Sequence, residues 1–164
     1  MAFIDKDQFK NGKNVEAFLD DFFANRGWII QHTTPHEERV LCLGDRFYTG
    51  KGRRLAVEYK SGIQTYYTGN VFLETVSVDA KSKPGWVYTC KADYLFYATL
   101  LNGKILVMIP DKLRERIETL KRNYPVVQTR HNQNDGYNTH GVIVPLAFAE
   151  KHLTEQIILL EDAA

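Results

Sequence analysis

The chain has 164 residues with 21 basic and 20 acidic side chains, a net charge of +1, and a length that fits one domain spanning residues 1–164. Hydrophobic residues make up 44% of the chain, which is enough for a core and excludes wholesale disorder. No apolar run reaches the ~18 residues of a membrane helix, and the first residues lack a secretory signal, so we expect a cytoplasmic protein without membrane partners. Cys42 and Cys90 form no CxxC pair and are expected to be buried thiols.

The first element that the sequence predicts is a helix. Its apolar residues recur at i, i+3, i+4, i+7 and i+8, which places Val15, Phe18, Leu19, Phe22 and Phe23 on one stripe. Asn11 or Asn14 is suited to cap its start, and Gly27 to end it. Extended segments are expected after it at 28–30, 40–49, 54–60 and 71–78, with a turn at 50–53.

The second half alternates between strands and helices. Strands are expected at 94–99 and 104–109, although 91–99 also fits a helix. Pro110 opens a helix whose apolar positions Leu113, Ile117 and Leu120 have helical spacing, and Pro125 stops it. A polar loop at 131–140, a short strand at 141–144 and a helix from residue 145 complete the chain. This order predicts an α/β or α+β domain with a central mixed sheet flanked by helices.

The turn at 50–53 sets the register of a hairpin that gathers charged residues. A two-residue loop would pair Gly50 with Arg53, and a four-residue loop would pair Thr49 with Arg54. Both loops give the same register, which predicts that Asp45 lies opposite Glu58. Directly opposed residues share one face of a sheet with Cβ atoms about 4.5–5.5 Å apart. Lys60 is two residues beyond Glu58 and therefore projects from the same face.

Two carboxylates this close repel each other unless a cation lies between them, and hard oxygen ligands of this kind suit Mg²⁺ or Mn²⁺. Such an ion activates water and polarises a phosphate oxygen, and Lys60 is suited to offset charge that grows on the phosphate. The competing interpretation is an incidental surface cluster, since Glu-x-Lys patterns are common and Asp79-Ala80-Lys81 is a similar acid-x-Lys pattern in this chain.

Asp45, followed after twelve residues by Glu58-Tyr59-Lys60 on a hairpin that comes after a helix, resembles the PD-(D/E)xK nuclease superfamily. The resemblance implies that family's restriction-endonuclease-like core of a helix, a three-stranded antiparallel meander, a helix and a further strand. The segments 68–74, 83–86 and 91–94 are also similar to small phage-type members. The resemblance implies that Asp45 and Glu58 bind metal with the Tyr59 carbonyl, that Lys60 is the catalytic lysine, and that Glu16 on the first helix adds a further catalytic acid. An interaction with the helix dipole or with solvent is the alternative role of Glu16. Gly44 stands where the motif's name has proline.

Further residues are candidates for accessory and DNA-binding roles. Glu74 and Lys91 are possible accessory residues, although a cross-strand contact and solvent exposure explain them as well. The expected DNA contacts come from basic residues near the turn and from polar or aromatic loop residues: Lys51, Arg53, Arg54, Tyr67, Asn70 and Lys83.

These observations predict a metal-dependent endodeoxyribonuclease of the restriction, homing or junction-resolving type, with DNA as its partner. One site per chain favours a homodimer if both strands are cut. The alternatives are a non-catalytic DNA- or protein-binding module of the same fold and a structural subunit of a phage or mobile element. Zinc-binding His spacing, nucleotide-binding glycine loops and serine-hydrolase elbows are not found.

Overall fold

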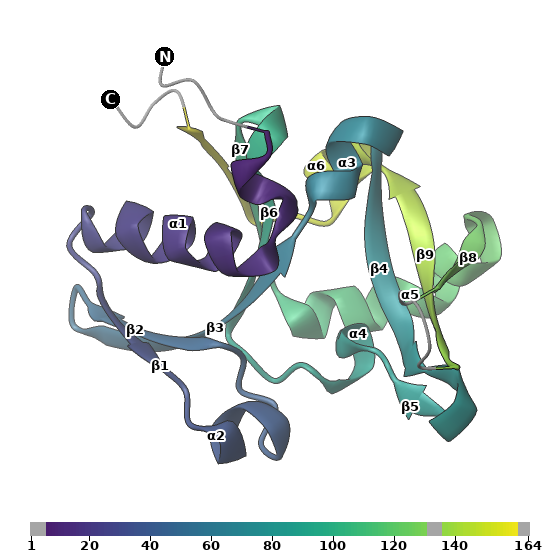
Figure 1. Cartoon of the computed structure of the whole chain (residues 1–164), viewed down its shortest axis with the longest axis horizontal. Helices are drawn as coiled ribbons and strands as arrows, with labels where there is room; N and C mark the ends of the chain where they lie inside the picture. The colour runs from purple at the N-terminus through teal and green to yellow at the C-terminus, as the bar shows by residue number, and fades with distance from the viewer. Residues whose placement is uncertain (1–5, 131–135, 161–164) are drawn as a thin grey trace.

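The computed structural model describes residues 6–130 and 136–160, which contain six α-helices, three short 3-10 helices and ten strands (Figure 1). In chain order they are η1 (Gln8–Lys10), α1 (Gly12–Ala24), β1 (Ile29–His32), α2 (Pro35–Arg39), β2 (Arg46–Gly50), β3 (Arg53–Ser61), α3 (Ile63–Thr68), β4 (Asn70–Val78), η2 (Asp79–Lys81), β5 (Lys83–Pro84), α4 (Trp86–Thr89), β6 (Tyr94–Thr99), η3 (Leu100–Asn102), β7 (Lys104–Met108), α5 (Pro110–Asn123), β8 (Val126–Arg130), β9 (Asn138–Pro145), α6 (Leu146–His152) and β10 (Gln156–Leu159). None of the helices in the described ranges has the length and apolar character needed to cross a membrane.

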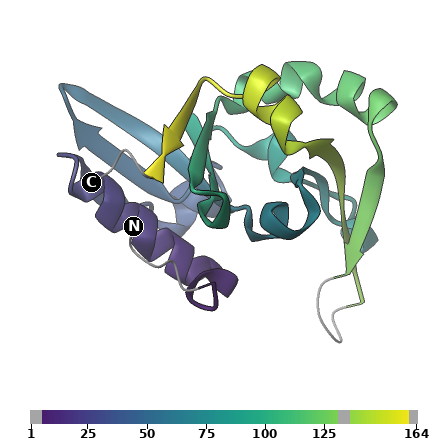
Figure 2. The same cartoon turned by 90° about the horizontal axis from the view of Figure 1, so that it is seen from above.

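Two sheets organise the molecule. The larger is mixed, with the order β1-β2-β3-β6-β7-β10, and only its β3–β6 pair is parallel. The smaller is antiparallel, with the order β5-β4-β9-β8, and Figure 2 shows its β8–β9 ribbon at the opposite end of the molecule from α1. The predicted mixed α/β class is confirmed, whereas the smaller sheet was not predicted.

Helix α1 lies over one face of the β1–β3 end of the larger sheet, as predicted from its apolar stripe (Figure 1). Leu19 and Phe23 are buried against Tyr48 of β2 and Val57 of β3. Of the two candidate caps, Asn11 is the one used, because its side chain accepts a hydrogen bond from the Lys13 amide at 2.9 Å. The apolar side of α1 therefore packs on one face of the β2–β3 hairpin and covers it.

The β2–β3 hairpin has the predicted register. Gly50 pairs with Arg53, and the pairing continues to Arg46 opposite Val57. Lys51 and Gly52 both have positive φ angles, of 51° and 72°, as a two-residue type I′ turn requires. The residues on either side of the turn are therefore aligned as expected.

Several sequence-based boundaries were wrong. The extended segment predicted at 40–49 is a strand only from Arg46, because a capping box between Thr34 and Glu37 starts α2 and a loop follows it. The ambiguous segment 91–99 is strand β6 from Tyr94 onward. Strand β9 already begins at Asn138, inside the polar loop predicted for 131–140, of which residues 131–135 lie outside the described part of the chain.

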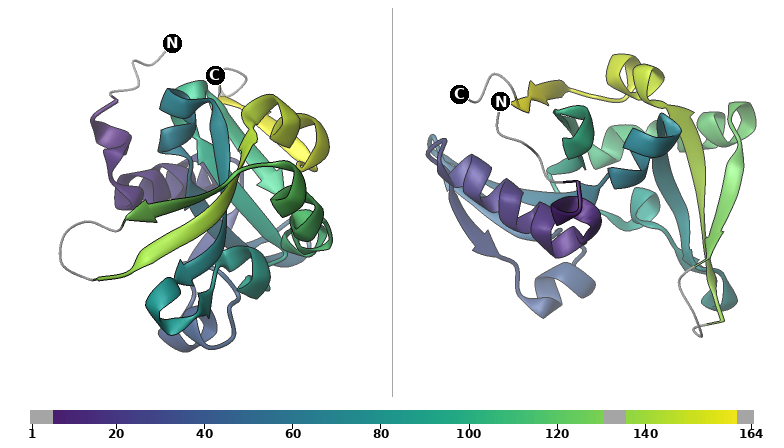
Figure 3. Two further views of the ribbon diagram at one scale, coloured as in Figure 1. Left: turned by 90° about the vertical axis from the view of Figure 1, so that its right-hand side faces the viewer. Right: turned by 45° about the horizontal axis from the view of Figure 1, so that its top comes forward.

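A shared core joins the two sheets. Leu73 of β4 and Val142 of β9 pack in one buried cluster with Tyr97 of β6, Leu106 of β7 and Leu113 of α5. Figure 3 shows α5 and α6 lying alongside the β8–β9 ribbon. Glu74 of β4 interacts electrostatically with Lys60 of β3, where the predicted catalytic residues lie.

Candidate active site

The predicted acids and lysine lie on the face of β3 that is turned away from α1. Val57 and Tyr59 are buried in the α1 core, so the alternating residues Glu58 and Lys60 project from the other face. The β2–β3 pairing ends at Arg46 opposite Val57, and Asp45 lies just before β2, where its amide donates to the Val57 carbonyl at 2.9 Å. Glu58 and Lys60 therefore share a face as expected, and Asp45 lies near enough to interact with both electrostatically.

The Asp45 carboxylate is anchored to β3 through its Oδ2 atom. This oxygen accepts a hydrogen bond from the Tyr59 amide at 2.7 Å. Gly44, which precedes Asp45, has φ of +94°, and a Cβ built there would lie 2.7 Å from the Val57 carbonyl oxygen. Only glycine allows the chain to approach β3 this closely, which explains the glycine in the position before the acid.

Glu58 and Lys60 form a close ion pair. Lys60 Nζ lies 2.6 Å from Glu58 Oε1, with side-chain exposures of 31% and 14%. Burial raises the pKa of Glu58, Lys60 opposes this, and the negative charge of Asp45 raises the pKa further. Burial works against the charged form of Lys60, but the carboxylates of Glu58, Asp45 and Glu74 outweigh it and raise the Lys60 pKa above its usual range. Lys60 is therefore an ammonium ion at neutral pH.

Glu74 brings a third carboxylate from the smaller sheet into the surroundings of Lys60. Its Oε1 accepts a hydrogen bond from the Trp86 amide at 3.3 Å, and Lys60 Nζ lies 5.9 Å from the Trp86 ring centroid. Gly85 makes this approach possible, because a Cβ there would overlap the Glu74 carbonyl oxygen. Glu74 therefore interacts with the cluster formed by Asp45, Glu58 and Lys60, and the accessory role of Glu74 stays a prediction.

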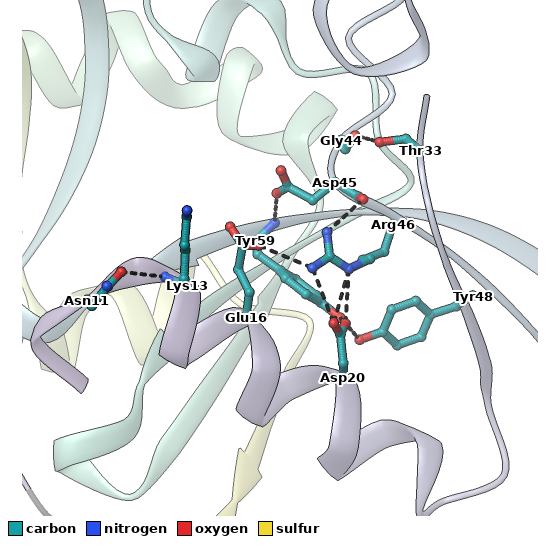
Figure 4. Close-up of polar contacts among 10 residues, drawn as sticks. All are labelled: Asn11, Lys13, Glu16, Asp20, Thr33, Gly44, Asp45, Arg46, Tyr48 and Tyr59. Atoms are coloured by element: carbon teal, nitrogen blue, oxygen red, sulfur yellow. Dashed lines mark hydrogen bonds and ion pairs between the residues drawn. The ribbon is translucent and has the colours of Figure 1, made fainter. Parts of the chain in front are cut away.

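Glu16 is engaged elsewhere in the structure. Its Oε2 accepts a hydrogen bond from Arg46 Nη2 at 3.1 Å on the α1 side of the hairpin (Figure 4). Glu58 and Lys60 project from the opposite face of β3. The structure therefore does not bring Glu16 into the ion-paired cluster, and its catalytic role stays a prediction, as does metal binding by the Tyr59 carbonyl.

The lining of the site comes from segments distant in the sequence. Glu38 of α2 and Cys90, which follows α4, lie near enough to Glu58 to interact with it electrostatically. Lys91 is exposed, and its amide donates to the Cys42 carbonyl at 2.8 Å. These contacts place Lys91 on a loop beside the site, and its role as an accessory residue stays a prediction.

The six predicted DNA contacts are spread over several elements. Arg54 shares the face of β3 that carries Glu58, four residues or about 13 Å away, and its guanidinium lies 4.0 Å from the Phe47 ring centroid. The other five are not gathered around the cluster: Lys51 and Arg53 lie at the hairpin tip, Tyr67 at the end of α3, Asn70 at the start of β4 and Lys83 in β5. Of the six, only Arg54 shares a face and a strand with the cluster.

The carboxylate oxygens of Asp45 and Glu58 are hard ligands, which suit a divalent cation such as Mg²⁺. Asp45 Oδ1 and Glu58 Oε2 receive no hydrogen bond from the described residues, and Glu58 is a largely buried carboxylate beside another negative charge. Residues 6–130 and 136–160 contain no group of three or more His, Cys, Asp or Glu side chains arranged to hold a metal. Two carboxylates and water are nevertheless enough for Mg²⁺, which usually keeps several waters.

Sequence reasoning missed the residues that support Asp45. Arg46 and Asp20 form a buried ion pair behind it, with Arg46 Nε 3.1 Å from Asp20 Oδ1. The available signal was weak: an arginine within a strand that is otherwise apolar on its α1 face, and an acid within the helix that covers it. Only the tertiary contact shows that they meet.

Comparison with protein-family models, with curated proteins and with solved structures found no match.

Proposed function

We propose that this protein is a metal-dependent endodeoxyribonuclease that uses Mg²⁺ or Mn²⁺. The observation that carries the proposal is that Asp45 Oδ2 accepts from the Tyr59 amide, between Glu58 and Lys60 on β3, whose side chains form an ion pair at 2.6 Å. The element order supports it: α1, the antiparallel β1–β3 meander and β6 parallel to β3 agree with the core that the sequence resemblance implies. The segment between β3 and β6 departs from that core, because α3, β4, β5 and α4 occupy the place of one helix.

Asp45 and Glu58 are the residues that would hold the metal. Each has one carboxylate oxygen anchored within the chain, by the Tyr59 amide and by Lys60 respectively, and one oxygen without such a bond. Such anchoring limits the rotation of both carboxylates, so little order has to be gained when a cation binds. A bound divalent ion would supply Lewis-acid polarisation of a phosphate oxygen and a lowered pKa for its water.

Lys60 acts as a cation in this proposal. The neighbouring carboxylates raise the pKa of Lys60 in the metal-free protein, which favours the ammonium form at neutral pH. The ammonium group can hold an attacking water by a hydrogen bond and offset negative charge on the phosphate. Glu74, which shares this environment, is a candidate to bind or orient water beside Lys60.

The position of Arg54 supports DNA as the substrate. It projects from the same strand face as Glu58 at about 13 Å, well within one helical turn of about 34 Å in B-DNA. A phosphate backbone that runs along this face of β3 would also pass Arg54. A single site per chain would cut one strand, so double-strand cutting would favour a symmetric homodimer.

The test is incubation of supercoiled, linear and four-way-junction DNA with the protein in Mg²⁺, in Mn²⁺ and in EDTA. We expect cleavage that EDTA abolishes and that Lys60→Met and Glu58→Gln reduce by at least about 100-fold, the scale of losing one oriented electrostatic group. The matched controls are Lys104→Met and Glu150→Gln, because the Lys104–Glu150 pair has a similar distance of 2.7 Å and similar exposures of 30% and 22%.

Equal cleavage in EDTA, or equal activity in the Lys60 and Lys104 variants, would overturn the proposal. Metal-independent DNA binding with no cleavage would favour the non-catalytic binding module instead. Absence of both cleavage and DNA binding would favour a structural role.

A further inference from the structure

Arg46 is a buried arginine at the start of β2, directly after Asp45. Only 5% of its surface is exposed. Its Nε and Nη2 atoms donate to Asp20 on α1 at 3.1 and 3.2 Å, and Nη2 also donates to Glu16 at 3.1 Å. The remaining terminal nitrogen, Nη1, donates to the Asp45 carbonyl oxygen at 3.0 Å. One planar group therefore links α1 to the backbone of a candidate metal ligand.

Tyr59 links the same acid on α1 to Asp45 by a second route. Its hydroxyl donates to Asp20 Oδ1 at 2.9 Å, while its amide donates to Asp45 Oδ2 at 2.7 Å. The Tyr48 hydroxyl forms a hydrogen bond with the Tyr59 hydroxyl and completes the network (Figure 4). Asp20 is thus the acceptor on which both routes converge.

The polar groups of Asp45 are almost fully used. Its amide donates to Val57 O at 2.9 Å, and its carbonyl accepts from Arg46 and from the Thr33 amide, the latter at 3.2 Å. Oδ2 accepts from Tyr59, so Oδ1 is the one polar atom of Asp45 without a hydrogen bond from the described residues. The carboxylate is held with a single oxygen directed away from its supports.

Anchoring α1 does not require this arrangement, since Leu19 and Phe23 already pack the helix onto the sheet. Burying charge is costly, and a buried ion pair is often no more stabilising than an apolar replacement. The guanidinium of Arg46 instead fixes an orientation. When Asp20 and Glu16 hold its Nε and Nη2 atoms, its planar geometry directs Nη1 toward the Asp45 carbonyl.

We propose that Arg46, held by Asp20 and Glu16, is a positioning residue that aims the free oxygen of Asp45 at a divalent cation. This inference rests on the proposed metal-dependent function. Residues that orient metal ligands from behind typically change metal affinity or activity by about 10- to 100-fold when they are removed. Asp20 and Glu16 act in the same way through Arg46.

The experiment measures Mn²⁺ affinity by titration calorimetry and exchange of the Tyr59 amide hydrogen by NMR in the full-length protein. Asp20→Asn should weaken Mn²⁺ binding about 10- to 100-fold and speed exchange of the Tyr59 amide. Glu16→Gln, at the more exposed edge of the network, should show a smaller change of the same sign and is the fallback if Asp20→Asn does not fold. Asp79→Asn is the control, because Asp79 also accepts several hydrogen bonds but lies in η2, next to the smaller sheet.

A folded Asp20→Asn protein with a lower melting temperature, unchanged Mn²⁺ affinity and a protected Tyr59 amide would overturn the inference and leave a purely structural ion pair. If the unmodified protein binds no Mn²⁺, the proposed metal-dependent function fails. In that case the exchange of the Tyr59 amide alone decides whether the network orders Asp45.

Discussion

Replacing Gly44 by alanine tests the geometry that places Asp45 against β3. Gly44 has φ of +94°, and an added Cβ would lie 2.7 Å from Val57 O and 2.9 Å from the Glu58 amide nitrogen. These neighbours are backbone atoms within a paired strand, so the Gly44–Asp45 segment has to move. We expect this movement to displace the Asp45 carboxylate from the Tyr59 amide.

Gly27 provides a matched control for the cost of backbone strain. Its φ is +90°, and a Cβ there meets nothing within 4 Å. Alanine at a left-handed position costs about 1–3 kcal/mol, so Gly27→Ala should lower the melting temperature by about 2–12 °C for a chain of this size. Gly44→Ala carries the same strain plus the collision, which adds about 1–3 kcal/mol of overpacking.

The assay compares thermal unfolding, Mn²⁺ affinity and DNA cleavage of the two variants. Gly27→Ala should lose stability alone, whereas Gly44→Ala should lose more stability and also metal affinity and cleavage at temperatures where it is folded. Equal destabilisation of the two variants, with the activities of both intact, would refute the argument that close approach at Gly44 positions Asp45.

Two further predictions concern titratable groups. Hydrogen bonds from the Asn138 amide and from His140 lower the pKa of Asp79 to about 2 from its usual 3.8, so this carboxylate stabilises the fold above pH ~4 and loses its contribution as the pH falls toward 2. The stability difference between wild type and Asp79→Asn in urea unfolding should therefore shrink over that interval, and a difference that is constant with pH would contradict the assignment. Burial raises the pKa of the Cys90 thiol to about 11, so at pH 8 a thiol reagent should label only the partly exposed Cys42 in the folded protein and both cysteines in denaturant. Rapid labelling of both in the native state would show that Cys90 is not buried as described.

Local patterns were sufficient to predict the elements whose burial is periodic. The stripe on α1 follows from helical spacing, and the helix that opens at Pro110 is α5. The register of the β2–β3 hairpin follows from the turn alone, because any symmetric loop around residues 51 and 52 pairs the same residues as far as Arg46 and Val57. Asp45 lies beyond that pairing, and its contact with the Tyr59 amide depends on the close approach of Gly44 to β3. Shorter elements such as α2 and α4 were missed, because four or five residues carry too little periodicity to distinguish them from loop.

Contacts between distant segments were decided by the tertiary structure alone. The smaller sheet depends on β4 pairing with β9 across some 70 residues, and no local pattern records that pairing. It is this sheet that brings Glu74 to Lys60, while packing of α1 directs Glu16 to Arg46. Side chains alternate along any strand, so the amino-acid order already predicts that Glu58 and Lys60 share one face of β3. The positions of Glu74 and Glu16 depend instead on how the sheets and α1 pack. That packing is driven by burial of apolar surface between elements that can be far apart in the sequence.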